Sequence, residues 1–370
     1  MRSTREERFL HPPNAWPTQM MLDPVDLAVA LMRIDSTSGH EGEVVRLAHS
    51  MLESEGWTVR RIPVSEGRDN IYATASETPL VTLSTHLDTV PPFLPPRVEG
   101  GRLLGRGACD AKGIAAAMIC AAERLRAREL PVALLFVVGE ETTHDGAHVA
   151  NAWPTTSRAL IDGEPTESTI AVGTKGALRL ILRAHGIAAH SAYPHLGKSA
   201  THLLLDVLHD VRALEFPSDA VLGDTTLNVG VIAGGVADNV VAPEAHARVM
   251  IRVVSDIDEI LARVREAVAH RVELQEIVRV APMRLATTPG FATSVVAYAT
   301  DVPVLSAWGT PYLFGPGSIN VAHRDDEYVE IAELRAAVDA YERLAVTALE
   351  RLPGDGTPVA RIPSHAPEPG

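Results

Sequence analysis

The chain has very few cysteines, and this scarcity limits what can hold it together. Only Cys109 and Cys120 occur among its 370 residues. Two thiols are too few for a disulfide framework or for a zinc site built from thiolates. The composition therefore fits a reducing compartment, and we expect a cytoplasmic protein.

Long apolar stretches are also missing. No segment is apolar for long enough to cross a bilayer, and MRSTREERFLHPPNAWPTQMML at the start has no continuous hydrophobic region of a signal peptide. We therefore expect neither a membrane span nor a secretory leader. Periodic structure is expected from about Asp23, and Met20 or Met21 is an alternative start. Residues 1–19 and the Pro- and Gly-rich residues 353–370 are expected to be flexible tails.

An excess of positive charge is the third absence, because the formal net charge is −14. An acidic chain is unsuited to nucleic acid or to an anionic membrane surface, so we expect neither as a partner. Apolar residues make up 46% and charged residues 22% of the chain, as in an ordinary globular protein. The length suits two domains, or one domain with a large insertion.

Short apolar runs alternate with a helical pattern in the first half of the chain. VTLSTHLD (81–88) and VALLFVVGEE (132–141) begin as apolar, β-branched runs, as expected of strands buried on both faces. AKGIAAAMICAAERLRARE (111–129), which lies between them, is typical of a helix. This β-α-β order predicts an α/β fold with a mostly parallel sheet flanked by helices.

The pattern changes from about Lys175 onward. Apolar and polar residues alternate, as is typical of half-exposed antiparallel strands, at 177–186, 225–235 and 244–254. Amphipathic helical patterns occur at 198–214 and 256–272. We predict an inserted α+β domain with an antiparallel sheet at 175–284. The α/β domain would then be discontinuous, with residues 20–174 and 285–352.

Acids and histidines gather where the predicted strands end. Loops at the carboxyl ends of parallel strands converge on one crevice, so these side chains should meet. They are His86, Asp88, Asp110, Glu140, Glu141, Glu164 and the later His323. So many carboxylates would repel one another unless cations neutralised them. Imidazole and carboxylate without thiolate suit catalytic zinc, manganese or cobalt, and the number of acids favours two metals that share a carboxylate.

These motifs match a known family. The chain resembles the M20 co-catalytic metallopeptidases and deacylases, a group that includes acetylornithine deacetylase, succinyl-diaminopimelate desuccinylase and carboxypeptidase G2. The resemblance rests on THLDTVP, GRGACDAKG, GEE, GEPT and AAHSAYP followed by His323, in the expected order between about Met20 and Leu352. It implies a phosphorylase/hydrolase-like catalytic domain and an inserted domain that acts as a lid and forms a homodimer.

The resemblance also implies which residues bind metal. Two divalent ions are expected in each chain, most simply zinc, with cobalt or manganese as substitutes. Asp110 would bridge both ions, and the other ligands would be His86 and Glu164 on the first, Glu141 and His323 on the second.

Two further acids would act without binding metal. Asp88 would accept a hydrogen bond from the second imidazole nitrogen of His86 and so fix its tautomer. Glu140 would be the general base, which takes a proton from a metal-bridging water and passes it to the leaving amine. Asp162 competes with Glu164 as a ligand, and the GEPT motif favours Glu164.

Five positions match residues that contact substrate in the family. His190, in AAHSAYP, would reach from the lid into the partner subunit's site and stabilise the oxyanion. Arg252 would hold the substrate's α-carboxylate, and Asn239 its carbonyl oxygen. Gly315 and Gly317 would form a tight turn that lines the pocket.

Other residues have simpler interpretations. Cys109 is next to Asp110, but a small buried thiol is favoured over a metal ligand, and Cys120 falls in a helical core pattern. Lys175 could partly replace an arginine pair of the desuccinylases, or face solvent. The remaining histidines without a motif are expected at the surface or in local hydrogen bonds: His144, His185, His195 and His246.

The leading hypothesis is a di-metal amidohydrolase that cleaves the amide bond of an N-acyl-L-amino acid. Acetylornithine or a related basic amino acid is the first candidate substrate, because an acidic protein attracts a cationic side chain. An M20 dipeptidase or carboxypeptidase acting on short peptides, or a succinyl-diaminopimelate desuccinylase, would need the same site. A catalytically silent dimeric binding protein is the hypothesis from another class, but no expected ligand or base is missing.

Overall fold

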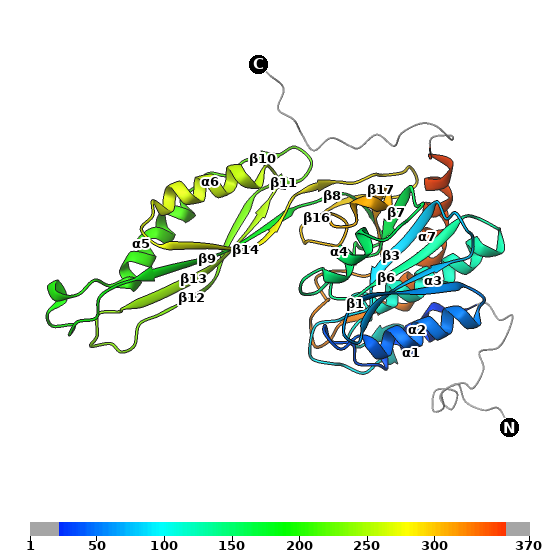
Figure 1. Ribbon diagram of the computed structural model, residues 1–370, viewed down its shortest axis with the longest axis horizontal. Coiled ribbons are helices and arrows are strands. Elements are labelled where there is room, and N and C mark those ends of the chain that lie inside the picture. Colours follow the sequence, from blue (N-terminus) through cyan, green and yellow to red (C-terminus); the bar gives the residue numbers. More distant parts are fainter. Residues whose placement is uncertain (1–21, 353–370) are drawn as a thin grey trace, which may run out of the picture.

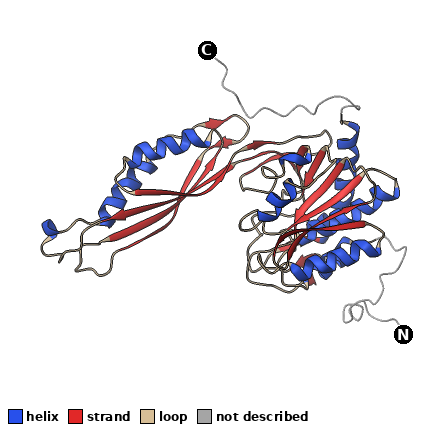
Figure 2. Ribbon diagram, in the orientation of Figure 1, coloured by secondary structure: helices blue, strands red, loops and turns tan. Residues whose placement is uncertain are grey.

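The computed structural model describes residues 22–352 and has two lobes (Figure 1). The expected tails at 1–19 and 353–370 lie outside the described residues. One lobe contains a mixed sheet with helices on both sides, and the other contains an antiparallel sheet with helices on one side (Figure 2). The predicted α/β fold with a separate antiparallel sheet is thus confirmed.

The first lobe is built on a six-stranded sheet. Its strands are β1 (Thr58–Ser65), β2 (Arg68–Thr74), β3 (Val81–His86), β6 (Val132–Val137), β7 (Ala159–Asp162) and β17 (Thr310–Leu313). The order is β1-β2-β6-β3-β7-β17, with β1 and β2 antiparallel at one edge and the other four parallel to one another. All residues of β3, β6 and β7 are buried, which explains the continuous apolar sequence of β6, whereas β3 buries threonine, serine and histidine side chains as well.

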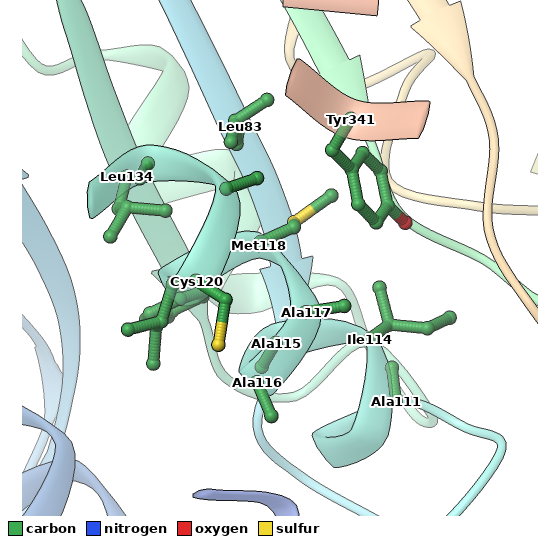
Figure 3. Close-up of a cluster of buried hydrophobic side chains, with 14 of the residues drawn as sticks. Leu83, Ala111, Ile114, Ala115, Ala116, Ala117, Met118, Cys120, Leu134 and Tyr341 are labelled. Carbon is green, nitrogen blue, oxygen red and sulfur yellow. The ribbon is translucent and has the colours of Figure 1, made fainter. Parts of the chain in front are cut away.

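Helices cover both faces of this sheet. The helices are α1 (Pro24–Met32), α2 (Gly42–Ser54), α3 (Lys112–Ala127), α4 (Asp145–Asn151) and α7 (Ile331–Glu350). Buried side chains of α1, α2, α3 and α7 form one core with one face of the sheet, while α4 packs on the other face beside the 3₁₀ turn η3 (Ser306–Trp308). Alanines on α3 let this helix lie close to β3 and β6 (Figure 3).

The core packing reaches the loops at the ends of the strands. Tyr341 of α7 lies near Ile114 of α3, and its hydroxyl donates to the carbonyl oxygen of Phe314 at 2.8 Å (Figure 3). A Cβ atom at Gly163, just after β7, would lie 2.4 Å from Cγ2 of Ile114. A larger residue would therefore push this loop away from the helix and displace Glu164, the next residue.

The second lobe carries the four-stranded lid sheet, which consists of β9 (Gly176–His185), β12 (Thr226–Gly234), β13 (Glu244–Val253) and β14 (Glu273–Val280). Its order is β12-β13-β9-β14, and every neighbouring pair is antiparallel. Helices α5 (Ala200–Arg212) and α6 (Ile257–Val268) pack against one face, and alternate residues of the two central strands are buried beneath them. This alternation is the pattern that predicted half-exposed strands.

Smaller sheets join and extend the two lobes. β8 (Ile170–Thr174) pairs with β15 (Met283–Arg284) and with β16 (Thr293–Val296), so the two chain segments that lead into and out of the lid sheet run side by side. The other elements are β4 (Arg97–Glu99), β5 (Arg102–Leu104), β10 (Ser218–Asp219), β11 (Gly223–Asp224), β18 (Tyr328–Glu330) and the 3₁₀ turn η2 (Pro194–Leu196). Within residues 22–352, no helix combines the length and apolarity that a membrane span requires.

Candidate active site

Three parallel strands end at one edge of the six-stranded sheet, and each delivers a polar side chain there. His86 is the last residue of β3, Glu141 follows β6, and Glu164 follows β7. Asp110 joins them from the loop before α3. The sheet therefore brings these residues together although they are far apart in the sequence.

The first group consists of His86, Asp110 and Glu164. One ligand atom of each lies within 4.8 Å of the others, and all three residues are buried. The Nε2 atom of His86 is 3.0 Å from Oδ1 of Asp110. Asp162, the alternative ligand, is the last residue of β7 and belongs to neither this group nor the second one.

The second group consists of Asp110, Glu141 and His323. The Nε2 atom of His323 is 3.0 Å from Oε1 of Glu141 and 3.3 Å from Oδ2 of Asp110. The two carboxylate oxygens of Asp110 thus face two different histidines, which is the arrangement of a bridging ligand. The side chain of His323 is 47% exposed, so this half of the site is open to solvent.

The backbone carbonyl and the carboxylate of Asp88 have different hydrogen-bond partners. The Nδ1 atom of His86 lies 2.9 Å from the carbonyl oxygen of Asp88 and 3.5 Å from its carboxylate. The carboxylate instead accepts hydrogen bonds from the Ser38 hydroxyl and from the backbone N–H groups of Glu140 and Glu141. The carbonyl oxygen of Asp88 is thus the nearer acceptor for His86, and its carboxylate, which we predicted to orient the imidazole, lies 3.5 Å away and also holds the loop of the predicted base.

Buried acids in this cluster bind protons more readily than usual. Burial raises the pKa of Glu140 and of Glu164 well above the ordinary value for glutamate. Neighbouring carboxylates add to this effect, because each negative charge disfavours the next one. Asp110 is the exception: burial would raise its pKa, but hydrogen bonds with His323 and His86 and the charges of both outweigh burial, so its pKa is lowered.

The two histidines hold protons for the opposite reason. Burial disfavours the charged form of His86, but hydrogen bonds with Asp110 and Asp88 outweigh it and raise the pKa of His86 well above its usual value. Hydrogen bonds that His323 donates to the carboxylates of Asp110 and Glu141 raise the pKa of His323 to about 10. In the metal-free chain, protons on the two histidines therefore balance the charge of the neighbouring carboxylates. A bound divalent cation would neutralise the same carboxylates. The donor set of two imidazoles and three carboxylates fits two such ions.

A third group lies beside the predicted base and contains two residues that the sequence did not indicate. Glu140, His144 and Asp301 each place a ligand-type atom within 4.8 Å of the others. The Nδ1 atom of His144 is 2.8 Å from Oδ1 of Asp301 and 3.8 Å from Oε1 of Glu140. We expected His144 at the surface or in a local hydrogen bond, but its partner Asp301 is 157 residues away in the sequence, and both side chains lie next to Glu140.

Glu327 is another functional residue without a signal in the sequence analysis. Its carboxylate accepts hydrogen bonds from the backbone N–H groups of Gly107, Cys109 and Asp110, and it pairs with Arg106 at 2.7 Å. Both side chains of this ion pair are buried. Glu327 therefore sets the position of the loop that carries Asp110.

The two predicted lining glycines serve close packing. A Cβ atom at Gly315 would lie 2.4 Å from the carbonyl oxygen of Glu164, and one at Gly317 would lie 2.5 Å from Sγ of Cys109. Gly317 also has a φ of 81°, which favours glycine. Cys109 is buried beside this turn, outside both groups around Asp110, and burial raises the pKa of its thiol.

The lid residues do not join the metal groups within the described chain. His190 forms a β-bridge with Val240, and the N–H of Ser191 donates to the carbonyl of Asn239 at 2.9 Å. These two loops lie at the far end of β9 and β13, away from the six-stranded sheet (Figure 1). Arg252 lies near the other end of β13, opposite Ala177.

The likeness to known proteins extends over most of the chain. The model of "Peptidase family M20/M25/M40" matches residues 82–347. The chain belongs to the M20 family. A "Peptidase M20 domain-containing protein" of Schizosaccharomyces pombe is 40% identical over 335 residues, which cover 87% of this chain and 84% of that protein. A "Probable carboxypeptidase" of Aspergillus terreus is 40% identical over 367 residues, with 86% and 85% covered.

Solved structures share the fold at low identity. A tripeptidase of Staphylococcus aureus has a TM-score of 0.74 with 19% identity and covers 89% of this chain and 100% of its own. An M20 family metallo-carboxypeptidase of Sulfolobus solfataricus has a TM-score of 0.70 with 16% identity, and the likeness covers 87% and 98% of the two chains. This M20 protein is therefore a metal-dependent hydrolase of C–N bonds. The family implies a dinuclear metal site, and the two groups that share Asp110 are the candidates for it.

Exchange of Glu327 tests how this M20 protein positions Asp110. Glu327→Gln keeps the size but replaces one accepting oxygen with an amide that faces N–H donors. We expect metal affinity to fall about tenfold to hundredfold, measured by competition with a chelating indicator. Glu330→Gln, which breaks an exposed ion pair with Arg102, is the matched control. Unchanged affinity in Glu327→Gln would show that the Asp110 loop holds its position without this carboxylate.

Metal uptake should be coupled to pH. The pKa of His323 is raised to about 10 and that of His86 is also raised, so both hold protons in the metal-free chain more strongly than ordinary histidines, whereas a histidine ligand must be neutral. Zinc binding should therefore release more than one proton per chain, and metal affinity should fall as pH falls. Calorimetric titration in buffers of different ionisation enthalpy measures this number. Heats that do not depend on the buffer would contradict the proposed ligand set.

Proposed function

We propose that this M20 hydrolase is a carboxypeptidase that releases the C-terminal residue of short peptides. The observation that carries the proposal is the 40% identity, over most of both chains, to a fungal relative named as a probable carboxypeptidase. The site is compatible with this chemistry, since it combines two metal-binding groups with a nearby glutamate that belongs to neither. The deacylase of the leading hypothesis receives less support from the named relatives.

Glu140 is the residue that moves the proton in this proposal. Its carboxylate is nearly buried, with a side chain 11% exposed, and its backbone is anchored on Asp88. Burial raises its pKa, which makes it a stronger proton acceptor than an ordinary glutamate. It takes a proton from the water that attacks the scissile carbonyl, and it returns this proton to the amine nitrogen when the C–N bond breaks. The products are a free carboxylate and a free amine.

Two metal ions would be held by His86, Asp110 and Glu164 and by Asp110, Glu141 and His323. When bound, they supply Lewis acidity that polarises the carbonyl and lowers the pKa of water. The mixed imidazole and carboxylate donors support zinc, with cobalt or manganese as substitutes.

The lid supplies the groups that orient the substrate. We propose that Arg252 holds the α-carboxylate with paired hydrogen bonds and that Asn239 contacts the carbonyl oxygen. His190 of the partner subunit would donate a hydrogen bond to the oxyanion. The position of the His190 loop at the far end of the lid supports action on another subunit, because it lies away from its own metal groups.

A homodimer through the lid is part of this proposal. β12 is an edge strand of the lid sheet, and its outer side has no pairing partner within the described residues. Val231, Ile232 and Val236 on or after this strand are 41%, 56% and 72% exposed. An unpaired edge with exposed apolar side chains supports pairing with a second copy.

Mixed dimers test whether His190 acts across the interface. His190→Ala and Glu140→Gln chains should each be nearly inactive alone, because one lacks the oxyanion donor and the other lacks the base. Heterodimers contain one site with both residues, so mixing should restore part of the activity. Native mass spectrometry confirms that heterodimers form. If they form without recovered activity, His190 acts within its own chain.

A substrate panel tests the proposed reaction. The zinc-loaded or cobalt-loaded protein should hydrolyse dipeptides and tripeptides with a free C-terminus, and it should lose this activity when a chelator removes the metals. N-acetyl amino acids, including N-acetylornithine, and N-succinyl-diaminopimelate belong in the panel. Faster turnover of an N-acyl amino acid than of every peptide would favour the deacylase instead.

Glu140→Gln is the control for the mechanism in the same assay. We expect kcat to fall by about a hundredfold to ten-thousandfold, because the amide cannot accept the proton. The two metals should remain, since Glu140 lies outside both groups around Asp110. Loss of metal in this variant would instead make Glu140 a ligand.

A further inference from the structure

The uncovered face of the lid sheet carries a row of arginines. In the register of β9 and β13, Arg252 lies opposite Ala177, and Arg179 lies opposite Met250 in the next row of the same face. The following row contains Arg248 opposite Ile181. Because side chains alternate across a strand, all of these point away from the face that α5 and α6 cover.

These guanidinium groups have no negative counterpart in the part of the chain that the structure describes. Among residues 22–352, no carboxylate lies within ion-pair distance of Arg179, Arg248 or Arg252. Their neighbours on the flanking strands are uncharged: Thr226 and Asn228 on β12, Val278 and Val280 on β14. A protein with a net charge of −14 thus keeps a local positive site without neutralising it.

Arg179 and Arg252 are close enough to affect each other. Diagonal neighbours on adjacent strands have side chains about 7 Å apart at their bases, within the reach of long side chains. Arg252 is half-buried, and burial, followed by the charge of Arg179, lowers its pKa. Two like charges held together without a counterion are unfavourable until an anion binds between them.

We propose that Arg179 and Arg252 together bind two carboxylates, so that the enzyme prefers peptides with a C-terminal glutamate or aspartate. Arg252 takes the α-carboxylate, and Arg179 takes the carboxylate of the side chain. This inference rests on the proposed function, in which Arg252 holds the C-terminal carboxylate. It reverses the expectation of a cationic side chain, because the local charge at the binding face, rather than the net charge, acts on the substrate.

The matched substrates Ala-Glu and Ala-Gln test this site, because they differ only in a charged carboxylate against a neutral amide. The wild-type enzyme should show a kcat/KM at least about tenfold higher for Ala-Glu, and Ala-Lys should be the poorest. Arg179→Gln should lower the ratio of kcat/KM for Ala-Glu to kcat/KM for Ala-Gln to about one, because the loss falls mainly on Ala-Glu. Arg179→Lys should keep part of it, because the charge remains without the paired donors.

Arg183→Gln is the control variant. Arg183 lies on the same face two rows further from Arg179, where its guanidinium contacts Gln275 at 3.4 Å. It should leave the ratio of Ala-Glu to Ala-Gln unchanged. Equal rates for the two dipeptides in the wild type, or an equal loss for both in Arg179→Gln, would overturn the proposal.

Binding to the Glu140→Gln protein separates this proposal from the proposed function. Calorimetry with Ala-Glu and Ala-Gln needs no turnover, so tighter binding of Ala-Glu that depends on Arg179 would support the dicarboxylate site even if no peptide is cleaved. If the enzyme hydrolyses peptides but prefers Ala-Glu neither in rate nor in binding, the carboxypeptidase proposal is supported and the dicarboxylate site is refuted. If a second copy covers this face, Arg179 is inaccessible, and that same lack of preference results.

Discussion

Asp110 stands between two histidines, and the active-site architecture depends on how its charge is shared. One oxygen faces His86 and the other faces His323, with Glu164 and Glu141 on the two sides. Burying several acids in one place is costly unless positive charge compensates them. In the metal-free chain protons on the two histidines provide this compensation, and in the M20 family two metal ions take their place.

The surrounding fold holds this cluster against its own repulsion. Glu327 accepts hydrogen bonds from three backbone N–H groups in the loop of Asp110. Asp88 accepts hydrogen bonds from the backbone N–H groups of Glu140 and Glu141. Both acids act on backbone rather than on metal, so the ligand loops are positioned before any ion arrives. Such preorganisation means that binding need not order the loops as well.

The lid and the six-stranded sheet carry different kinds of polar side chains. The six-stranded sheet presents the acids and histidines of the candidate metal site, whereas the lid sheet presents arginines that have no carboxylate within ion-pair distance among residues 22–352. β8, β15 and β16 connect the two lobes, so substrate orientation and chemistry are assigned to separate cores. Specificity can therefore change on β9 and β13 without disturbing the buried carboxylates.

The sequence by itself determined the main elements and showed that acids and histidines follow the predicted strands, because burial imposes a local pattern. Apolar runs predicted β3 and β6, alternation predicted β9 and β13, and strand ends indicated the ligands. Only the tertiary structure decided which distant residues become partners: Glu327 with the Asp110 loop, Asp301 with His144, and Arg179 with Arg252. These contacts depend on loop paths and strand register, and no periodicity along the chain encodes them, since a shift of one residue in register would turn Arg179 to the other face.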